Sequence, residues 1–380
     1  MLLTLLNHWP DAWRFVDPSA LDKITMRAAL AAAASFAVAL LLGTPVIKWL
    51  ARRFREPIKS ASTAIEQLHA PKAATPTMGG IFVLAGLAGS CLLFGDWTNS
   101  YLSIAIGVMI ALGAVGAYDD YIKLTTERRG LSGGTKLIAQ SATAVVAATA
   151  IAHAQASSGV SATISFPLIG RFELGLACVP WAALVIVASS NAVNLADGLD
   201  GLAGGCLISA ALAIAVLAYA GGHAGWAAYL GIEHVPGAGE MAVVAAAAVG
   251  ALLGFLWFNC HPAQVFMGNT GALGLGGLLG VLAVVARHEV LLVVIAGVFV
   301  VEAASVILQV ASFRIRKKRI FRCAPLHHHF QLAGIPEGKI VVRFWIAGAL
   351  CAIVALASLK FAAREPAFDA HLPANHTAFR

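Results

Sequence analysis

Charged residues are scarce in this chain: Asp, Glu, Lys and Arg make up only 12% of its 380 residues, whereas 59% are hydrophobic. Soluble domains carry about 25% charged residues. The mean hydropathy of +0.81 also lies well above the range of such domains. The shortage of charge therefore excludes an ordinary soluble domain and predicts a chain embedded in a membrane.

The sequence also lacks the cysteine pairs of disulfide frameworks and metal clusters. Its six cysteines are dispersed and include no CxxC motif, which favours small apolar residues within helices. The first twenty residues lack a basic segment followed by an unbroken apolar stretch, so we expect no cleaved signal peptide. No nucleic-acid-binding motif accompanies the net charge of +7, so we expect no nucleic acid partner.

Long apolar runs recur along the chain, and each is long enough to cross a hydrocarbon core of about 30 Å as a helix. The sequence predicts an all-α integral membrane protein with about ten transmembrane helices, forming one polytopic domain over residues 1–380. Segments 1–22 and 364–380 are expected to be short periplasmic tails. The expected spans lie near residues 26–50, 78–97, 100–118, 137–156, 174–193, 202–221, 241–258, 271–287, 290–313 and 341–362.

Lys and Arg gather in three connections, residues 51–72, 119–136 and 314–339, which hold 16 of the 26 basic residues. The positive-inside rule makes these loops cytoplasmic and places both termini in the periplasm. Each of them follows an odd-numbered span, and so do the polar segments 191–205 and 258–277. All five segments therefore face one side, which predicts an active site on the cytoplasmic face.

Glycine-rich segments at three expected helix boundaries, 76–80, 197–205 and 268–277, allow two interpretations. Small residues favour close helix packing in a bilayer, whereas a helix start with exposed N–H groups is an anion site. The polar residues among these glycines favour the second interpretation, with phosphate as the anion. Lys72 and Lys136 each lie beside a glycine-containing helix start, with Lys136 close to Gly133 and Gly134.

Two adjacent carboxylates, Asp119 and Asp120, follow the expected third span, and Lys123 lies one helical turn further on. One interpretation is a solvated helix end with an i,i+4 ion pair. The other is a carboxylate pair that binds a hard divalent cation such as Mg²⁺, or accepts a proton near a phosphate.

Asp197 and Asp200 are spaced i,i+3, and Asn191 and Asn194 lie just upstream. Asp is also an ordinary capping and turn residue. Four polar residues at one-turn spacing beside an apolar run nevertheless favour a binding rim, because such groups at a membrane boundary need partners.

A run of three histidines, His327, His328 and His329, follows the ninth span. Consecutive side chains do not converge on one metal ion without an irregular backbone, so phosphate binding or an acid–base role near neutral pH is favoured. The basic tract 314–319 is assigned to topology and to anionic head groups. Glu302, isolated within the ninth span, is left outside the expected site.

Several of these segments together resemble a known family, the polyprenyl-phosphate N-acetylhexosamine-1-phosphate transferases. The resemblance covers most of the chain, and "PLHHHF" followed by "VVRFW" points to the muramoyl-peptide branch rather than the GlcNAc branch. The segments that carry it are "PKAATPTMGG", "DDYIK", "NAVNLADGLDGLAGG", "FNCHPAQVFMG" and "CAPLHHHFQLAGIPEGKIVVRFW".

The resemblance implies a ten-helix, Mg²⁺-dependent homodimer of the bacterial inner membrane. Such an enzyme moves phospho-MurNAc-pentapeptide from UDP-MurNAc-pentapeptide to undecaprenyl phosphate, giving lipid I and UMP. Asp119 and Asp120 would be the catalytic carboxylates, and the histidine run, with His328 as a catalytic residue, would lie near the sugar phosphates. The uridine and pyrophosphate site would comprise Lys72, Thr77, Lys123, Lys136, Asn191, Asn194, Asp197, Asp200, Asn259 and Phe266.

One position departs from the family pattern. Where the family typically has "FMGD", with Asp as a Mg²⁺ ligand, this chain has "FMGN" with Asn269. An amide oxygen can still bind Mg²⁺ but brings no charge. We therefore hypothesise that Asn269 remains a ligand beside Asp119 and Asp120, and that Asp119, Asp120 or Asp200 carries more of the charge. Two alternatives stay open: a related enzyme that uses UDP-GlcNAc, and a transporter, which the one-sided charge and the lack of a repeat disfavour.

Overall fold

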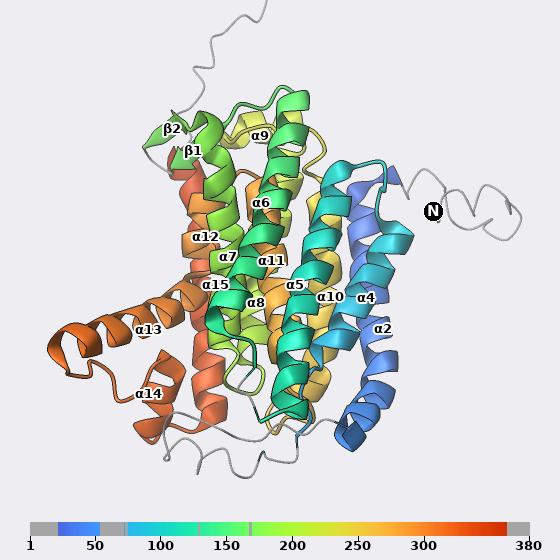
Figure 1. The fold of residues 1–380 in the computed structure, drawn as a ribbon. Coiled ribbons are helices and arrows are strands. Elements are labelled where there is room, and N and C mark those ends of the chain that lie inside the picture. Colours follow the sequence, from blue (N-terminus) through green and yellow to red (C-terminus); the bar gives the residue numbers. More distant parts are fainter. Residues whose placement is uncertain (1–21, 54–71, 73–74, 128–129, 167–168, 363–380) are drawn as a thin grey trace, which may run out of the picture.

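The computed structural model describes residues 22–53, 72, 75–127, 130–166 and 169–362 (Figure 1). These residues form a bundle of helices with one antiparallel hairpin, β1 Thr163–Phe166 and β2 Gly170–Glu173, and a 3₁₀ turn at Gly175–Ala177. The helices are α2 Ile24–Arg53, α4 Gly80–Phe94, α5 Ser100–Thr125, α6 Gly133–Ser157, α7 Cys178–Ala196, α8 Leu202–Gly221, α9 Ala224–Leu230, α10 Glu240–Asn259, α11 Gly268–Val285, α12 Glu289–Ile295, α13 Gly297–Arg316, α14 Leu326–Leu332 and α15 Glu337–Ala362.

Nine helices in the described part of the chain are long and apolar enough to cross a membrane, which confirms the predicted all-α membrane architecture. The expected span 78–97 is the shorter helix α4, with 15 residues. It begins late because the segment before it is extended and bonds to the chain ahead of α11. Phe266 N donates to Pro76 O, and Gly79 N donates to Phe266 O, each at 2.8 Å.

The expected span 290–313 is two helices rather than one. α12 ends at Ile295 and α13 begins at Gly297, where a Cβ would lie only 2.8 Å from Cys351 Sγ on α15. Figure 1 shows α13 leaving the bundle sideways and α14 lying below it. Because of this break, the basic tract at the end of α13 lies to the side of the bundle. The histidine run lies on α14, below α13.

Helix α11 forms the centre of the bundle, and 89% of its residues are buried. Its glycines let neighbouring helices approach closely, as small residues do in membranes. A Cβ at Gly274 would lie 3.0 Å from Met109 O of α5, and one at Gly276 would lie 2.8 Å from Ser189 O of α7. This packing holds the middle of α11 closely against α5 and α7.

The predicted tails fall almost entirely on residues 1–21 and 363–380, which lie outside the described residues. The cytoplasmic assignment of the basic loops and the single-domain organisation stay predictions. The bundle end that carries the end of α5, the start of α11 and α14 is called the polar end below.

Candidate active site

Two adjacent carboxylates lie in the last turns of α5, and each residue is only 3% exposed. Asp119 Oδ2 lies 2.8 Å from Lys123 Nζ and 3.8 Å from Lys136 Nζ of α6. Its Oδ1 accepts a hydrogen bond from Leu131 N at 2.8 Å. Asp120 Oδ1 lies 3.7 Å from the same Lys123 ammonium. Because buried carboxylates need such partners, the two lysines are part of the site.

The start of α11 supplies further donors to this carboxylate pair. Thr270 donates from N and from Oγ1 to Asp120 Oδ2, each at 3.0 Å. The side-chain amide of Asn269 donates to Asp119 Oδ2. The structure thus brings together Asp119, Asp120 and Asn269, the three residues expected to hold a metal ion.

Two glycines permit this close approach of α5 and α11. A Cβ at Gly116 would lie 2.1 Å from Asn269 O, and one at Gly268 would lie 2.8 Å from Asp120 Oδ2. Gly268 also has a φ of +73°, a conformation that glycine adopts far more readily than other residues. The glycines of "FMGN" and of the α5 end therefore serve packing at the site.

A second polar cluster joins the loop after α7 to the start of α15. Lys72 Nζ lies 2.7 Å from Asp200 Oδ1 and 2.6 Å from Glu337 Oε1. His261 Nδ1 lies 2.9 Å from Asp200 Oδ2, and Glu337 also accepts from Asp200 N at 2.9 Å. Within the described residues, Asp200, His261 and Glu337 are the group of three side chains with metal-ligand spacing. The Lys72 ammonium, however, already forms ion pairs with Asp200 and Glu337.

The extended segment before α4 connects the two clusters. Lys72 reaches Asp200, and Thr77 lies five residues further along. A Cβ at Gly268 would lie 2.9 Å from Thr77 Oγ1, which places this hydroxyl beside the carboxylate pair. Thr77 is 2% exposed, and its Oγ1 has no hydrogen-bond partner among the described residues.

The rim predicted from the end of α7 is only partly free to bind a ligand. Asn191 Nδ2 donates to Gln140 Oε1 at 2.7 Å and to Val187 O at 2.9 Å, so its amide ties α7 to α6. Asn194 is half-buried, and Asp197 is the C-cap residue of α7.

Asn259 and Phe266 both form hydrogen bonds to the backbone of neighbouring segments. The Asn259 amide accepts from Gly201 N at 2.9 Å and donates to Val265 O at 2.8 Å, and the residue is 4% exposed. Half-buried Phe266 pairs through its backbone with the segment before α4. Asn259 therefore holds two site loops together, and Phe266 fixes the segment before α4.

The three histidines lie in different environments. His327 is fully buried and packs on Gly198, where a Cβ would lie 2.3 Å from His327 Nε2. Its Nδ1 lies 3.3 Å from Glu302 Oε2, and its backbone N donates to Glu302 Oε1 at 3.1 Å. Glu302, left outside the expected site, therefore holds the start of α14 against the loop after α7.

The other two histidines are half-buried on α14. His328 Nδ1 lies 2.8 Å from Gln331 Oε1. His329 Nδ1 accepts from Arg322 N at 3.2 Å, and its ring meets Phe321 edge-on. The three histidines therefore contact different partners and do not share one coordination sphere.

Sequence reasoning missed His261 and Glu337, which complete the Asp200 cluster. Glu337 follows a proline at a helix start, where an acidic residue is common for electrostatic reasons alone, and His261 stands alone in its loop. Only the fold brings them together, so no local pattern could have identified them.

Comparison with known proteins adds a separate line of evidence. A family model, "Glycosyl transferase family 4", matches residues 102–287, which include Asp119, Asp120 and Asn269. The phospho-N-acetylmuramoyl-pentapeptide-transferase of Nitratidesulfovibrio vulgaris (strain DP4) is 46% identical over 342 residues. That of Thermodesulfovibrio yellowstonii is 44% identical over 342 residues. Each alignment covers 89% of this chain and 94% of the relative.

The chain belongs to the phospho-N-acetylmuramoyl-pentapeptide-transferase family. It is a multi-pass membrane transferase of the bacterial inner membrane. The relative from Methylacidiphilum infernorum (isolate V4), at 42% identity over 344 residues, is also aligned over 94% of its own length. Both site clusters at the polar end therefore belong to a chain related to these transferases over nearly its whole length.

Proposed function

We propose that the protein transfers phospho-MurNAc-pentapeptide from UDP-MurNAc-pentapeptide to undecaprenyl phosphate, forming lipid I and releasing UMP. The observation that carries this proposal is the buried pair Asp119 and Asp120, held between two lysines at the end of a membrane helix. A lipid phosphate reaches such a position from the bilayer, whereas a nucleotide reaches it from water. The relatives' name supplies the identity of the transferred group.

The donor set beside α5 suits Mg²⁺. Asp119 and Asp120 offer carboxylate oxygens and Asn269 an amide oxygen, which are hard ligands, and the Asn269 amide already contacts Asp119. The Asp200 cluster suits Mg²⁺ less well, because it includes the His261 ring nitrogen, whereas Mg²⁺ prefers oxygen ligands. When bound, Mg²⁺ would neutralise charge on the diphosphate of the donor.

Phosphoryl transfer depends mainly on positioning and charge neutralisation. In the proposed direct route, an oxygen of the lipid phosphate forms a bond to the sugar-linked phosphorus, and the bond to the UMP oxygen breaks. Asp119 accepts any proton carried by the lipid phosphate, while Lys123 and Lys136, beside it, hold phosphate oxygens. UMP leaves with the electron pair of the broken bond.

A two-step route through an aspartyl-phosphate is the alternative mechanism. It requires Asp119 or Asp120 to attack the donor before the lipid binds. Incubation with donor alone, followed by mass spectrometry of the α5 peptide, separates the two routes. We expect no phosphorylated aspartate, and its accumulation would contradict the direct route.

The second cluster is proposed to bind the nucleotide part of the donor. Lys72 and the rim at Asn194 and Asp197 would contact uridine and pyrophosphate, with the Phe266 ring stacked on the base. His327 and His329 hold α14 in place while His328 reaches the sugar phosphate. We further propose that the polar end is cytoplasmic and that the protein works as a homodimer in membrane lipid.

UMP release by the detergent-purified protein tests the choice of donor. We expect UMP release with UDP-MurNAc-pentapeptide plus undecaprenyl phosphate, and none with UDP-GlcNAc or without the lipid. UMP release from UDP-GlcNAc alone would contradict the proposed function and favour the related GlcNAc transferases.

A further inference from the structure

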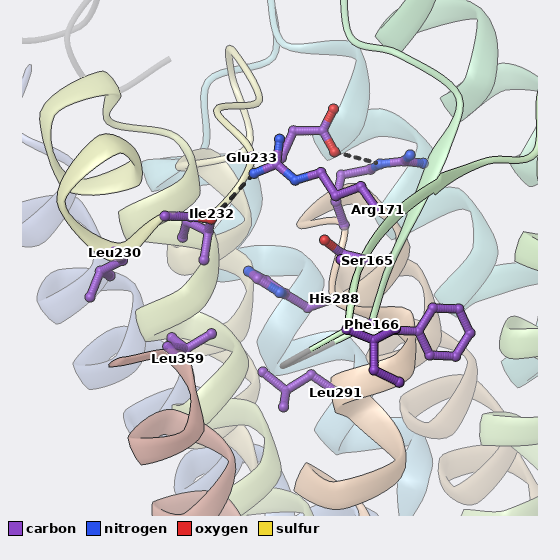
Figure 2. Close-up of a pocket in the computed structure, with 13 residues that line it drawn as sticks. Ser165, Phe166, Arg171, Leu230, Ile232, Glu233, His288, Leu291 and Leu359 are labelled. Atoms are coloured by element: carbon purple, nitrogen blue, oxygen red, sulfur yellow. Dashed lines mark hydrogen bonds and ion pairs between the residues drawn. The ribbon is translucent and has the colours of Figure 1, made fainter. Parts of the chain in front are cut away.

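A cavity of about 390 Å³ opens at the bundle end opposite the carboxylate pair, next to the hairpin (Figure 2). This volume lies within the range of about 300–1,000 Å³ typical of small-ligand sites. The hairpin, the loop after α9, the start of α12 and the end of α15 all contribute to its wall. None of its lining residues takes part in the transferase site proposed above.

The cavity is polar at one end and apolar at the other. Figure 2 shows Arg171 and Glu233 above His288, with Leu291 and Leu359 below it toward the middle of the bundle. A small soluble anion needs only polar contacts. A wall with this division fits a ligand that has a charged head and an apolar chain.

Arg171 provides the charge for such a head. Its guanidinium donates to Gly231 O at 3.3 Å, and it forms no ion pair with a carboxylate among the described residues, so most of its donors remain available. The other arginine of the wall, Arg287, already has protein partners. It donates to Ser161 O at 3.0 Å, its Nε lies 3.5 Å from Glu233 Oε2, and its Nη1 lies 3.8 Å from Glu289 Oε1. Of the two arginines in the wall, Arg171 is therefore the one available to an anionic group.

His288 provides a buried polar contact. It is 7% exposed, and its Nε2 has no hydrogen-bond partner among the described residues. Burial, with the nearby arginines, lowers the pKa of His288 to about 4, so the imidazole is neutral at pH 7. An unpaired buried polar atom costs free energy, and a ligand oxygen or hydroxyl in the cavity would relieve this cost.

The apolar surface beside the cavity favours a membrane lipid. Ile169, at the hairpin turn, lines the cavity and is 72% exposed, and Phe166 is 37% exposed. Trp226 and Tyr229 on the neighbouring α9 are also exposed, as is typical of aromatic residues at a membrane–water interface. Acyl chains would therefore leave the cavity along apolar side chains.

We propose that this cavity binds the phosphate-bearing headgroup of an anionic phospholipid from the leaflet at this end of the bundle. Arg171 and His288 contact the headgroup, and Leu291 and Leu359 contact the start of the acyl chains. The ligand is a structural or regulatory lipid rather than a substrate, because the cavity lies at the opposite end from the carboxylate pair.

Native mass spectrometry of the full-length protein, titrated with phosphatidylglycerol, phosphatidylcholine or inorganic phosphate, tests this site. We expect phosphatidylglycerol to bind at least about tenfold more tightly than phosphatidylcholine, since one charge-assisted contact has about that value. Arg171→Gln, at an exposed position, should remove the preference. Lys23→Gln, which removes an exposed cation at the same end but outside the cavity wall, should keep it.

His288→Leu retains volume and removes Nε2, so it should also weaken phosphatidylglycerol binding while leaving phosphatidylcholine binding unchanged. Equal phosphatidylglycerol affinity in wild type and Arg171→Gln would overturn the proposal. Inorganic phosphate that binds as tightly as the lipid would overturn it too, because the cavity would then recognise a free anion.

Discussion

At the scale of single residues, Asn269 donates a hydrogen bond to Asp119 that an aspartate in its place would not provide. Asn269→Asp should lower the Mg²⁺ concentration that half-saturates turnover by about tenfold, because ligand charge tunes affinity. Without Mg²⁺, the same variant should unfold more easily by about 1–3 kcal/mol, since a donor becomes a third carboxylate. Mg²⁺ titration of UMP release and thermal unfolding in EDTA measure the two effects. Identical Mg²⁺ dependence in both proteins would count against a metal role for Asn269.

The carboxylate pair allows a second test at this scale. Asp119→Asn and Asp120→Asn should each lower kcat by about 10²–10⁴, the range for loss of acid–base and charge-stabilising groups. Asp96→Asn, at an exposed position near the other end of α5, is the matched control and should retain near-normal kcat. Near-normal turnover in either pair variant would exclude an essential role for that carboxylate.

At the scale of elements, the contact between α5 and α11 positions the pair. Gly116→Ala should destabilise the protein by about 1–3 kcal/mol and reduce UMP release, because its Cβ would meet the backbone at Asn269. Gly107→Ala, on the same helix with no atom within 4 Å of its Cβ, should be neutral or stabilising by up to about 1 kcal/mol. Thermal unfolding in detergent compares the two. Equal stability of both variants would show that α5 and α11 can move apart at Gly116 without loss of stability.

Also at the scale of elements, the sequence predicts the membrane helices but not the helix break or the long-range contacts of the site. Long apolar runs predict the membrane helices because hydrophobic length alone sets a span. They do not predict the break at Gly297, where the chain packs closely against Cys351 of α15. The neighbouring Asp119 and Asp120 stand out in the sequence. The Lys72–Glu337 contact joins residues far apart in the chain, and no spacing rule indicates it.

At the scale of the whole molecule, the distribution of basic residues predicts that the polar end is cytoplasmic. Alkaline phosphatase, which needs oxidising conditions for its disulfides, should therefore be active when fused after Ser158, at the hairpin end. It should be inactive when fused after Lys318, in the basic loop that follows α13. An active Lys318 fusion would show that the orientation is the opposite one, with the carboxylate pair outside the cell.

The central claim is that the carboxylate pair at the polar end transfers the sugar phosphate to a lipid. The most direct measurement follows a labelled UDP-MurNAc-pentapeptide into the lipid phase, with purified protein, undecaprenyl phosphate and Mg²⁺. We predict one labelled lipid formed for each UMP released, and neither product with EDTA or with Asp119→Asn. UMP release without labelled lipid, or lipid formation that persists in Asp119→Asn, would contradict the account.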